Sequence, residues 1–196
     1  MIAIILAGGK SSRMGWHRGG EKAVTKIDGK RLIDLVVESV SESKVADFFV
    51  AISDNTPETE AYCKRVRYKT VATPGAGYHE DLQYLLSCYP EFISVACDIP
   101  FLRTEHINAM LDAFSSHRTS ITGAVSRKIV PKKVIPSYTF EHEGKELVSC
   151  GINVVTSSKD TIPFLFNDPL LGINVNTRDD LRIANIISQK SKKSLK

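Results

Sequence analysis

Short apolar runs alternate with helix-like stretches along most of the chain. The strand-like runs span residues 2–6, 47–53, 68–73, 92–97, 119–125, 151–155 and 171–176. Apolar residues recur at helical spacing over 32–40, 79–89 and 105–114. Strands that alternate with helices indicate βαβ units. We therefore predict an α/β fold of the Rossmann-like, doubly wound type, with a mostly parallel sheet and helices on both faces.

Capping residues mark where several of these helices begin. Thr56 before Pro57 is typical of an N-cap followed by proline in the first turn, and Thr104 is positioned to cap the helix that follows it. Near the C-terminus, Thr177 and Asp180 have the spacing of a capping box that starts the last helix.

Two segments depart from the alternation. Segment 126–150 contains two prolines, alternates like a strand and has a turn at Glu143–Gly144. We predict an extended excursion or a β-hairpin near the ligand-binding cleft, where an acceptor-binding or an oligomer surface could form. Segment 190–196 is rich in lysine and serine, which is typical of a frayed, solvated tail. We expect one domain over 1–189, followed by this basic tail.

The first strand leads directly into a glycine-rich turn. Small residues let the backbone bend sharply and let a ligand approach the main chain, and successive amides form an anion cradle. A P-loop is excluded because its first glycine would fall on Ile4, and the dinucleotide pattern GxGxxG does not fit either. We predict a triphosphate site, with a tight turn bearing solvated basic residues as the alternative. The candidate residues are Leu6, Ala7, Gly8, Gly9, Lys10, Ser11 and Arg13.

This stretch resembles the LAGGxSxRMG signature of the nucleotidyltransferase superfamily. The resemblance implies that a lysine soon afterwards contacts the phosphates, and Lys22 supplies it here. We expect Lys22 to bridge the α-phosphate and the departing pyrophosphate, and Arg13 to contact the β- and γ-phosphates. The spacing between Arg13 and Lys22 is a few residues longer than in the family.

Asp98 directly follows the apolar run 92–97, at the expected carboxyl end of a central strand. Mg²⁺ uses one or two protein carboxylates together with substrate phosphates, so we predict that Asp98 binds Mg²⁺; a turn that caps the next helix is the alternative. Arg13, Lys22 and Asp98 are the predicted catalytic residues. Asn174 and Asn176 are weaker candidates for contacts with the metal or the phosphates.

Segment 73–82, TPGAGYHEDL, combines two glycines with acidic residues at a helix start. Gly77, Glu80 and Asp81 are predicted to bind the nucleotide, because a carboxylate can accept hydrogen bonds from a guanine base. Acidic residues also favour a helix N-terminus through the helix dipole. Both interpretations stay open for Glu80 and for Asp81.

Composition narrows the class of protein. The 196 residues are 42% hydrophobic and 24% charged, with a net charge of +4, as in ordinary globular proteins. We see no membrane-spanning run and no signal peptide, so we expect a cytoplasmic protein that does not insert into a membrane. No aromatic residues interleave with the lysines of the tail, which argues against nucleic acid as a partner. The cysteines lack CxxC spacing, which favours reduced packing residues.

Together, LAGGKSSRMG, EK, TPGAGYHEDL, CDIPF, GINVV and NVNTRDDL resemble the archaeal-type GTP:adenosylcobinamide-phosphate guanylyltransferases over nearly the whole chain. The resemblance implies that GTP and a phosphorylated corrinoid, adenosylcobinamide phosphate, give adenosylcobinamide-GDP and pyrophosphate. It also implies that Gly151, Ile152 and Asn153 lie on the acceptor side. The alternatives are a molybdenum-cofactor guanylyl- or cytidylyltransferase, another nucleotidyltransferase, and a non-catalytic GTP-binding regulator. We expect a monomer or a homodimer.

Overall fold

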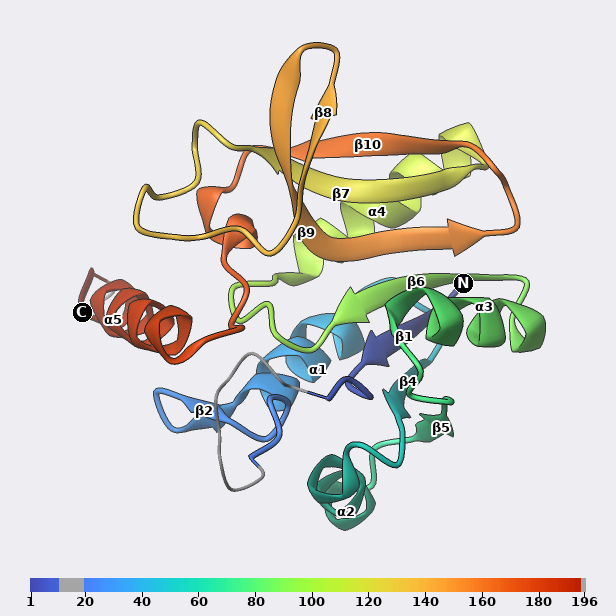
Figure 1. The fold of residues 1–196 in the computed structure, drawn as a ribbon, viewed down its shortest axis with the longest axis horizontal. Helices are drawn as coiled ribbons and strands as arrows, with labels where there is room; N and C mark the ends of the chain where they lie inside the picture. The colour runs from blue at the N-terminus through green and yellow to red at the C-terminus, as the bar shows by residue number, and fades with distance from the viewer. Residues whose placement is uncertain (11–19, 195–196) are drawn as a thin grey trace.

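The computed structural model describes residues 1–10 and 20–194 (Figure 1). The strands are β1 (Ile2–Leu6), β2 (Lys26–Ile27), β3 (Lys30–Arg31), β4 (Phe48–Ile52), β5 (Thr70–Ala72), β6 (Glu91–Ala96), β7 (Ser120–Ser126), β8 (Thr139–His142), β9 (Lys145–Thr156) and β10 (Thr161–Phe166). The helices are α1 (Leu32–Ser41), α2 (Pro57–Val66), α3 (Tyr78–Cys88), α4 (Thr104–His117) and α5 (Arg178–Ser194), with a short 3-10 helix, η2 (Pro169–Gly172). No helix in these ranges is long and apolar enough to cross a membrane.

The main sheet has the strand order β10-β7-β9-β6-β1-β4-β5. β1 lies at its centre and pairs in parallel with β4 and β6, while β4–β5 and β7–β10 are also parallel pairs. Only β9 runs against its neighbours among the main strands, pairing antiparallel with β6, β7 and β8. The predicted mostly parallel sheet is therefore confirmed, with β9 as its reversed strand.

Helices cover both faces of this sheet, as predicted. Because successive side chains of a strand point to opposite faces, Ile5 of β1 packs in the large core that includes residues of α1, α2 and α4. Ile4, one position earlier, packs on the other face with Leu85 of α3. Burying each such side chain contributes about 1.5–3 kcal/mol. The two-sided burial of β1 explains its continuous apolar run.

The strand predicted over 171–176 is wrong. Asp168 accepts a hydrogen bond from the Leu170 amide and starts η2 with Pro169, so the chain turns here. Leu171, Ile173 and Val175 are all buried, and this alternation imitates a strand. Sequence reasoning also missed β10, which contains Pro163. β10 lies at the sheet edge, where a missing amide hydrogen is tolerated.

Three other expectations can be compared with the structure. Segment 126–150 ends in the predicted hairpin: β8 and β9 join through Glu143 and Gly144, both with positive φ, and project at the top of Figure 1. Arg103, and not Thr104, is the N-cap of α4, because the His106 side chain accepts from the Arg103 amide. α5 continues as far as Ser194, into the segment for which the sequence predicts a frayed tail.

Candidate active site

Two adjoining cavities lie at the carboxyl ends of β1 and β6, the edge where α/β sheets bind ligands. Both are lined by Leu6, Tyr78 and Ala96. The first, of about 370 Å³, is called the glycine-lined cavity, and its other lining residues are Gly8, Gly9, Lys10, Ala51, Thr73, Gly75, Ala76, Gly77 and Asp81. The second, of about 470 Å³, is called the asparagine-lined cavity, and its other lining residues are His79, Asp98, Thr122, Ser137, Tyr138, Ser149, Gly151, Asn153, Asn174 and Asn176.

The glycine-lined cavity is held open by hydrogen bonds between three loops. Ser53, after β4, donates its hydroxyl to the Gly8 carbonyl at 2.7 Å. Asn55 donates to the Gly75 carbonyl at 3.0 Å, and the Gly75 amide donates to the Asp81 carboxylate at 2.8 Å. These bonds fix the backbone of the first loop against that of segment 73–82.

Gly75 is a position of this wall that requires glycine. Gly75 has φ +66°, and a Cβ there would lie 2.5 Å from Asn55 Nδ2 and 2.7 Å from Ser53 Oγ. Gly9 differs, since a Cβ there would meet no atom within 4 Å. A side chain at Gly75 would therefore strain the backbone and displace the loop.

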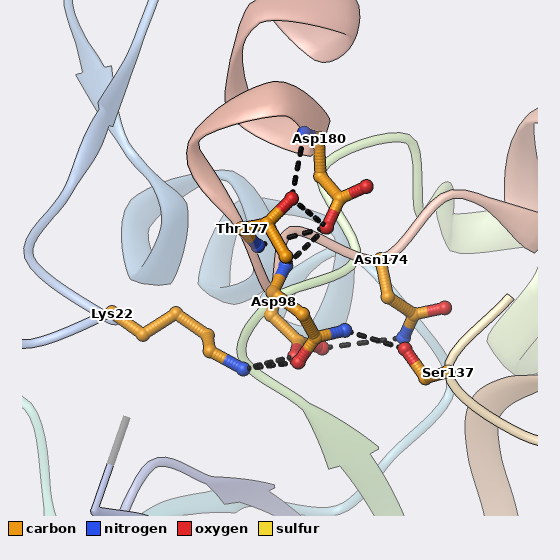
Figure 2. Close-up of polar contacts among 7 residues, drawn as sticks. Lys22, Asp98, Ser137, Asn174, Thr177 and Asp180 are labelled. Atoms are coloured by element: carbon orange, nitrogen blue, oxygen red, sulfur yellow. Dashed lines mark hydrogen bonds and ion pairs between the residues drawn. The ribbon is translucent and has the colours of Figure 1, made fainter. Parts of the chain in front are cut away.

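Asp98 and Asn176 line the asparagine-lined cavity, and Lys22 contacts both of them. Figure 2 shows the contact between Lys22 and Asp98. Lys22 Nζ donates to Asp98 at 2.8 Å and to the Asn176 amide oxygen at 2.7 Å. Asp98 and Asn176 are buried, which strengthens these charge-assisted bonds. Lys22 and Asp98 come together from positions 76 residues apart.

Main-chain bonds set the positions of these groups. The Cys97 amide donates to the Leu6 carbonyl and extends the β1–β6 pairing to the residue before Asp98. The Val175 amide donates to the Asp98 carbonyl at 2.9 Å. The Asp180 carboxylate accepts from the backbone amides of Asn176 and Thr177, and the Asp180 amide donates to the Thr177 hydroxyl. The last two bonds confirm the predicted capping box of Thr177 and Asp180 (Figure 2). The irregular segment 173–176 is thereby fixed beside Asp98.

Asp98 and Asn174 carry oxygen atoms of the kind that a hard cation binds. Asn174 Nδ2 donates to Asp98 at 3.3 Å, and the buried Asn174 Oδ1 has no hydrogen-bond partner among the described residues. Those residues contain no cluster of three or more His, Cys, Asp or Glu that would fit a metal. One carboxylate and an amide oxygen, completed by substrate phosphates, fit Mg²⁺. Mg²⁺ at Asp98 stays a prediction.

Glu21 is a residue that sequence reasoning did not assign. It is buried, and its two carboxylate oxygens accept from the amides of Glu58 and Thr59, each at 2.7 Å. These are the first amides of α2. Thr56 is the N-cap residue and Pro57 the first helical residue, as predicted, but the Thr56 side chain makes no capping hydrogen bond. Glu21 therefore caps α2 from a distant point of the chain and fixes the backbone next to Lys22.

Cys97 lies beside Asp98 but is not suited to be a nucleophile. Burial, with the Asp98 charge as a smaller contribution, raises the pKa of the Cys97 thiol to about 12. Since the thiolate is the reactive form, Cys97 remains a packing residue, as the sequence predicts.

The predicted site residues fall into four groups. Gly8, Gly9, Lys10, Gly77 and Asp81 line the glycine-lined cavity, while Asp98, Gly151, Asn153, Asn174 and Asn176 line the other. Ala7 and Ile152 have side chains in the core, and Glu80 is exposed outside both linings. Ser11 and Arg13 lie outside the described residues.

Gly151 has a local reason to be glycine. Its φ is +71°, and a Cβ would lie 3.0 Å from Ala96 Cβ and 3.4 Å from Asn174 Nδ2. The register of β9 against β7 shifts next to it, between the positions paired with Thr122 and Ala124. This irregularity lets β9 pass close to the Asp98 edge of the sheet.

Comparisons with known sequences agree with this arrangement. The sequence matches a MobA-like NTP transferase domain over residues 3–165. It is 36% identical to an adenosylcobinamide-phosphate guanylyltransferase from Methanocaldococcus jannaschii, over 97% of this chain and 98% of that protein. It is 27% identical to a molybdenum cofactor guanylyltransferase from Desulfosudis oleivorans, over 94% of each.

Solved structures share the fold at low sequence identity. A CMP:2-keto-3-deoxy-manno-octonic acid synthetase complexed with CTP superimposes with a TM-score of 0.68 at 15% identity, covering 96% of this chain and 99% of that one. A 4-diphosphocytidyl-2C-methyl-D-erythritol synthase from Anaerococcus prevotii gives 0.68 at 12% identity, covering 96% and 97%. By its domain match and its full-length relative, the chain belongs to the family of MobA-like NTP transferase domains.

Proposed function

We propose that this protein transfers the guanylyl group of GTP to adenosylcobinamide phosphate, forming adenosylcobinamide-GDP and pyrophosphate in the cytoplasm. One observation supports nucleotidyl transfer above all: a glycine-rich cavity adjoins a polar cavity that is lined by Asp98, and Asp98 is paired with Lys22 at 2.8 Å. The choice of acceptor is supported by the full-length similarity to the adenosylcobinamide-phosphate guanylyltransferase from Methanocaldococcus jannaschii.

In the proposed reaction, GTP occupies the glycine-lined cavity and the acceptor occupies the asparagine-lined cavity. An oxygen of the acceptor phosphate attacks the α-phosphorus of GTP in line. The bond from that phosphorus to the bridging oxygen breaks, and pyrophosphate leaves. The attacking phosphate is already anionic at neutral pH, so the reaction needs no general base. Positioning and charge neutralisation therefore supply most of the catalysis.

Each polar group has a proposed task. Lys22 Nζ would replace its bonds to Asp98 and Asn176 with bonds to phosphate oxygens, and would neutralise the negative charge of the phosphates. Asp98 and the Asn174 amide oxygen would hold Mg²⁺, which when bound neutralises phosphate charge. Asp81, which lines the glycine-lined cavity, is favoured over the exposed Glu80 for contacting the guanine base.

An acceptor competition assay tests the proposal. The protein is incubated with GTP, MgCl₂ and either adenosylcobinamide phosphate or a molybdenum-cofactor acceptor, and pyrophosphate release and the mass of the product are measured. We expect turnover with the corrinoid acceptor and a product heavier by one guanylyl group. Turnover only with the molybdenum-cofactor acceptor would establish that alternative, which the relative from Desulfosudis oleivorans makes relevant. Tight GTP binding without acceptor-dependent turnover would indicate a GTP-binding regulator.

A further inference from the structure

The segment between β7 and β8 ends in two exposed residues, Ser137 and Tyr138, which line the asparagine-lined cavity. The segment itself is anchored, because Val130 and Val134 are buried in the main core. The Ser149 amide of β9 donates to the Tyr138 carbonyl at 3.1 Å. The two side chains are therefore presented to the cavity from a fixed backbone.

Ser137 is connected to Lys22 through Asn176. The Asn176 amide nitrogen donates to Ser137 Oγ, while the Asn176 amide oxygen accepts from Lys22. Figure 2 shows the Ser137 side chain in the same network of polar contacts as Lys22 and Asp98. Because the Ser137 oxygen is the acceptor in this bond, its own O–H is a donor that can be directed to a ligand in the cavity.

Two tyrosines form apolar walls of the same polar cavity. Tyr138 is 63% exposed, and its ring stacks on Phe140 with centroids 6.1 Å apart. Tyr78, 51% exposed, accepts a hydrogen bond from Asn153 through its hydroxyl at 3.1 Å. Exposed aromatic side chains at a pocket mark a binding surface for an apolar body. Residues 8–10 of the first loop line the other cavity, and Tyr138 lines the asparagine-lined cavity but not that one, so the acceptor is the ligand that the Tyr138 ring would meet.

We propose that Ser137 and Tyr138 recognise the acceptor: the Ser137 hydroxyl donates to the acceptor's phosphate, and the Tyr138 ring packs against its macrocyclic body. This inference rests on the proposed function. It makes Ser137 a residue that contacts the attacking phosphate and, through Asn176, holds that phosphate near Lys22. Tyr138 determines specificity by favouring a macrocyclic acceptor over a small phosphomonoester.

Steady-state kinetics of four variants test the proposal. Ser137→Ala is expected to raise the KM for adenosylcobinamide phosphate about 10-fold or more, as for loss of a hydrogen bond to a charged group, and to leave the KM for GTP within 2-fold. Ser137→Thr, which keeps a hydroxyl, should recover much of the loss. Tyr138→Ala should raise the same KM about 10-fold. Ile135→Ala is the matched control, since Ile135 is 83% exposed on the same segment but does not line the cavity.

The possible results separate this inference from the proposed function. A wild-type protein without turnover on adenosylcobinamide phosphate would overturn both. A wild-type protein with turnover, but with an unchanged acceptor KM in Ser137→Ala and Tyr138→Ala, would overturn this inference alone. A Ser137→Ala variant that changed only kcat or the KM for GTP would also overturn it, because that result indicates a structural role. Thermal unfolding of each variant confirms that it is folded.

Discussion

The glycine-lined and asparagine-lined cavities share Leu6, Tyr78 and Ala96, but their walls consist of different groups. Four of the twelve residues that line the glycine-lined cavity are glycines, and its backbone is fixed by the side chains of Ser53, Asn55 and Asp81. The asparagine-lined cavity is bounded by side chains from distant segments. A backbone wall is damaged by adding atoms, whereas a side-chain wall is damaged by removing a polar group. The two cavities should therefore respond to opposite kinds of substitution.

The largest effect is expected from Asp98→Asn in the asparagine-lined cavity. The change removes one negative charge and retains an amide oxygen that can accept from Lys22. We expect kcat to fall by about 100-fold or more, because charge stabilisation in the transition state is lost. Pyrophosphate release at saturating substrates is the measurement, and thermal unfolding reports whether the fold is intact.

Mg²⁺ dependence provides the control for this variant. If Asp98 holds the metal, the wild-type protein loses activity on chelation and recovers it with MgCl₂, while Asp98→Asn requires a higher Mg²⁺ concentration. An Asp98→Asn variant with wild-type kcat and wild-type Mg²⁺ dependence would show that Asp98 only anchors Lys22.

A glycine pair probes the backbone wall of the glycine-lined cavity. Gly75→Ala should lower the free energy of unfolding by about 1–3 kcal/mol, because the left-handed backbone and the Ser53 and Asn55 contacts oppose a Cβ. Gly9→Ala is the matched control, with open space for its Cβ. Chemical denaturation measures stability, and nucleotide titration measures binding.

Comparing the two glycine variants should distinguish a role in folding from a role in binding the nucleotide. We expect Gly75→Ala to lose both stability and GTP affinity. Gly9→Ala should keep its stability and lose affinity only if the nucleotide approaches this backbone closely. Equal stability losses in both variants would show that the φ angle and close contacts at Gly75 are not what makes glycine necessary there.

The same difference explains what could be predicted from the sequence. The glycine-lined cavity is formed largely by two contiguous motifs, 6–10 and 73–82, so local pattern identified most of it. Asn174 and Asn176 stand out as polar residues in an apolar segment, but that segment is not the strand that the alternation predicts. Buried and exposed residues alternate both in strands and in irregular extended segments, so the hydrophobic pattern alone cannot distinguish a strand from an irregular segment.

Other residues of the site have no local signal. Ser137 contacts Asn176 across 39 positions, and Glu21 caps α2 across 37 and 38. A serine in a proline-containing segment and a glutamate before a lysine are unremarkable until the sheet order places them. β1, α1 and the hairpin of β8 and β9 were predictable because periodicity or turn residues define them within a few positions.

Substitution of Glu21 should have a smaller effect on stability and on kcat. Glu21→Ala removes the acceptor for the first α2 amides and should lower the free energy of unfolding by about 1–2 kcal/mol, as for loss of a helix cap. Because Lys22 is the next residue, kcat should fall as well. Denaturation and initial rates are measured on the same preparation.

Glu60→Ala is the matched control on the same helix. Glu60 pairs with Lys64 at the surface, so its loss should change stability by less than about 0.5 kcal/mol and leave kcat unchanged. Equal effects of Glu21→Ala and Glu60→Ala on kcat would indicate that Glu21 does not position Lys22.

The smallest effect on stability should come from the protonation of His106, which is buried next to the segment that leads to the asparagine-lined cavity. His106 is buried beside Asp168, whose carboxylate starts the turn that leads to Asn174. Burial, and then the Arg103 charge, lower the pKa of His106 below its usual 6.5, and Asp168 and Glu105 oppose this shift. The unfolded chain therefore binds a proton more readily than the folded protein, so this contribution to stability is complete above pH 6.5 and is lost as the pH falls through the lowered pKa.

His106→Gln separates this titration from the structural role of the ring. Glutamine at this position of a capping box can accept from the Arg103 amide, as His106 Nδ1 does, but does not titrate. We expect the melting temperature of His106→Gln to fall less than that of the wild-type protein between pH 7 and pH 5. Parallel curves for the two proteins would show that protonation of His106 does not limit stability, and that the support behind Asn174 is independent of pH.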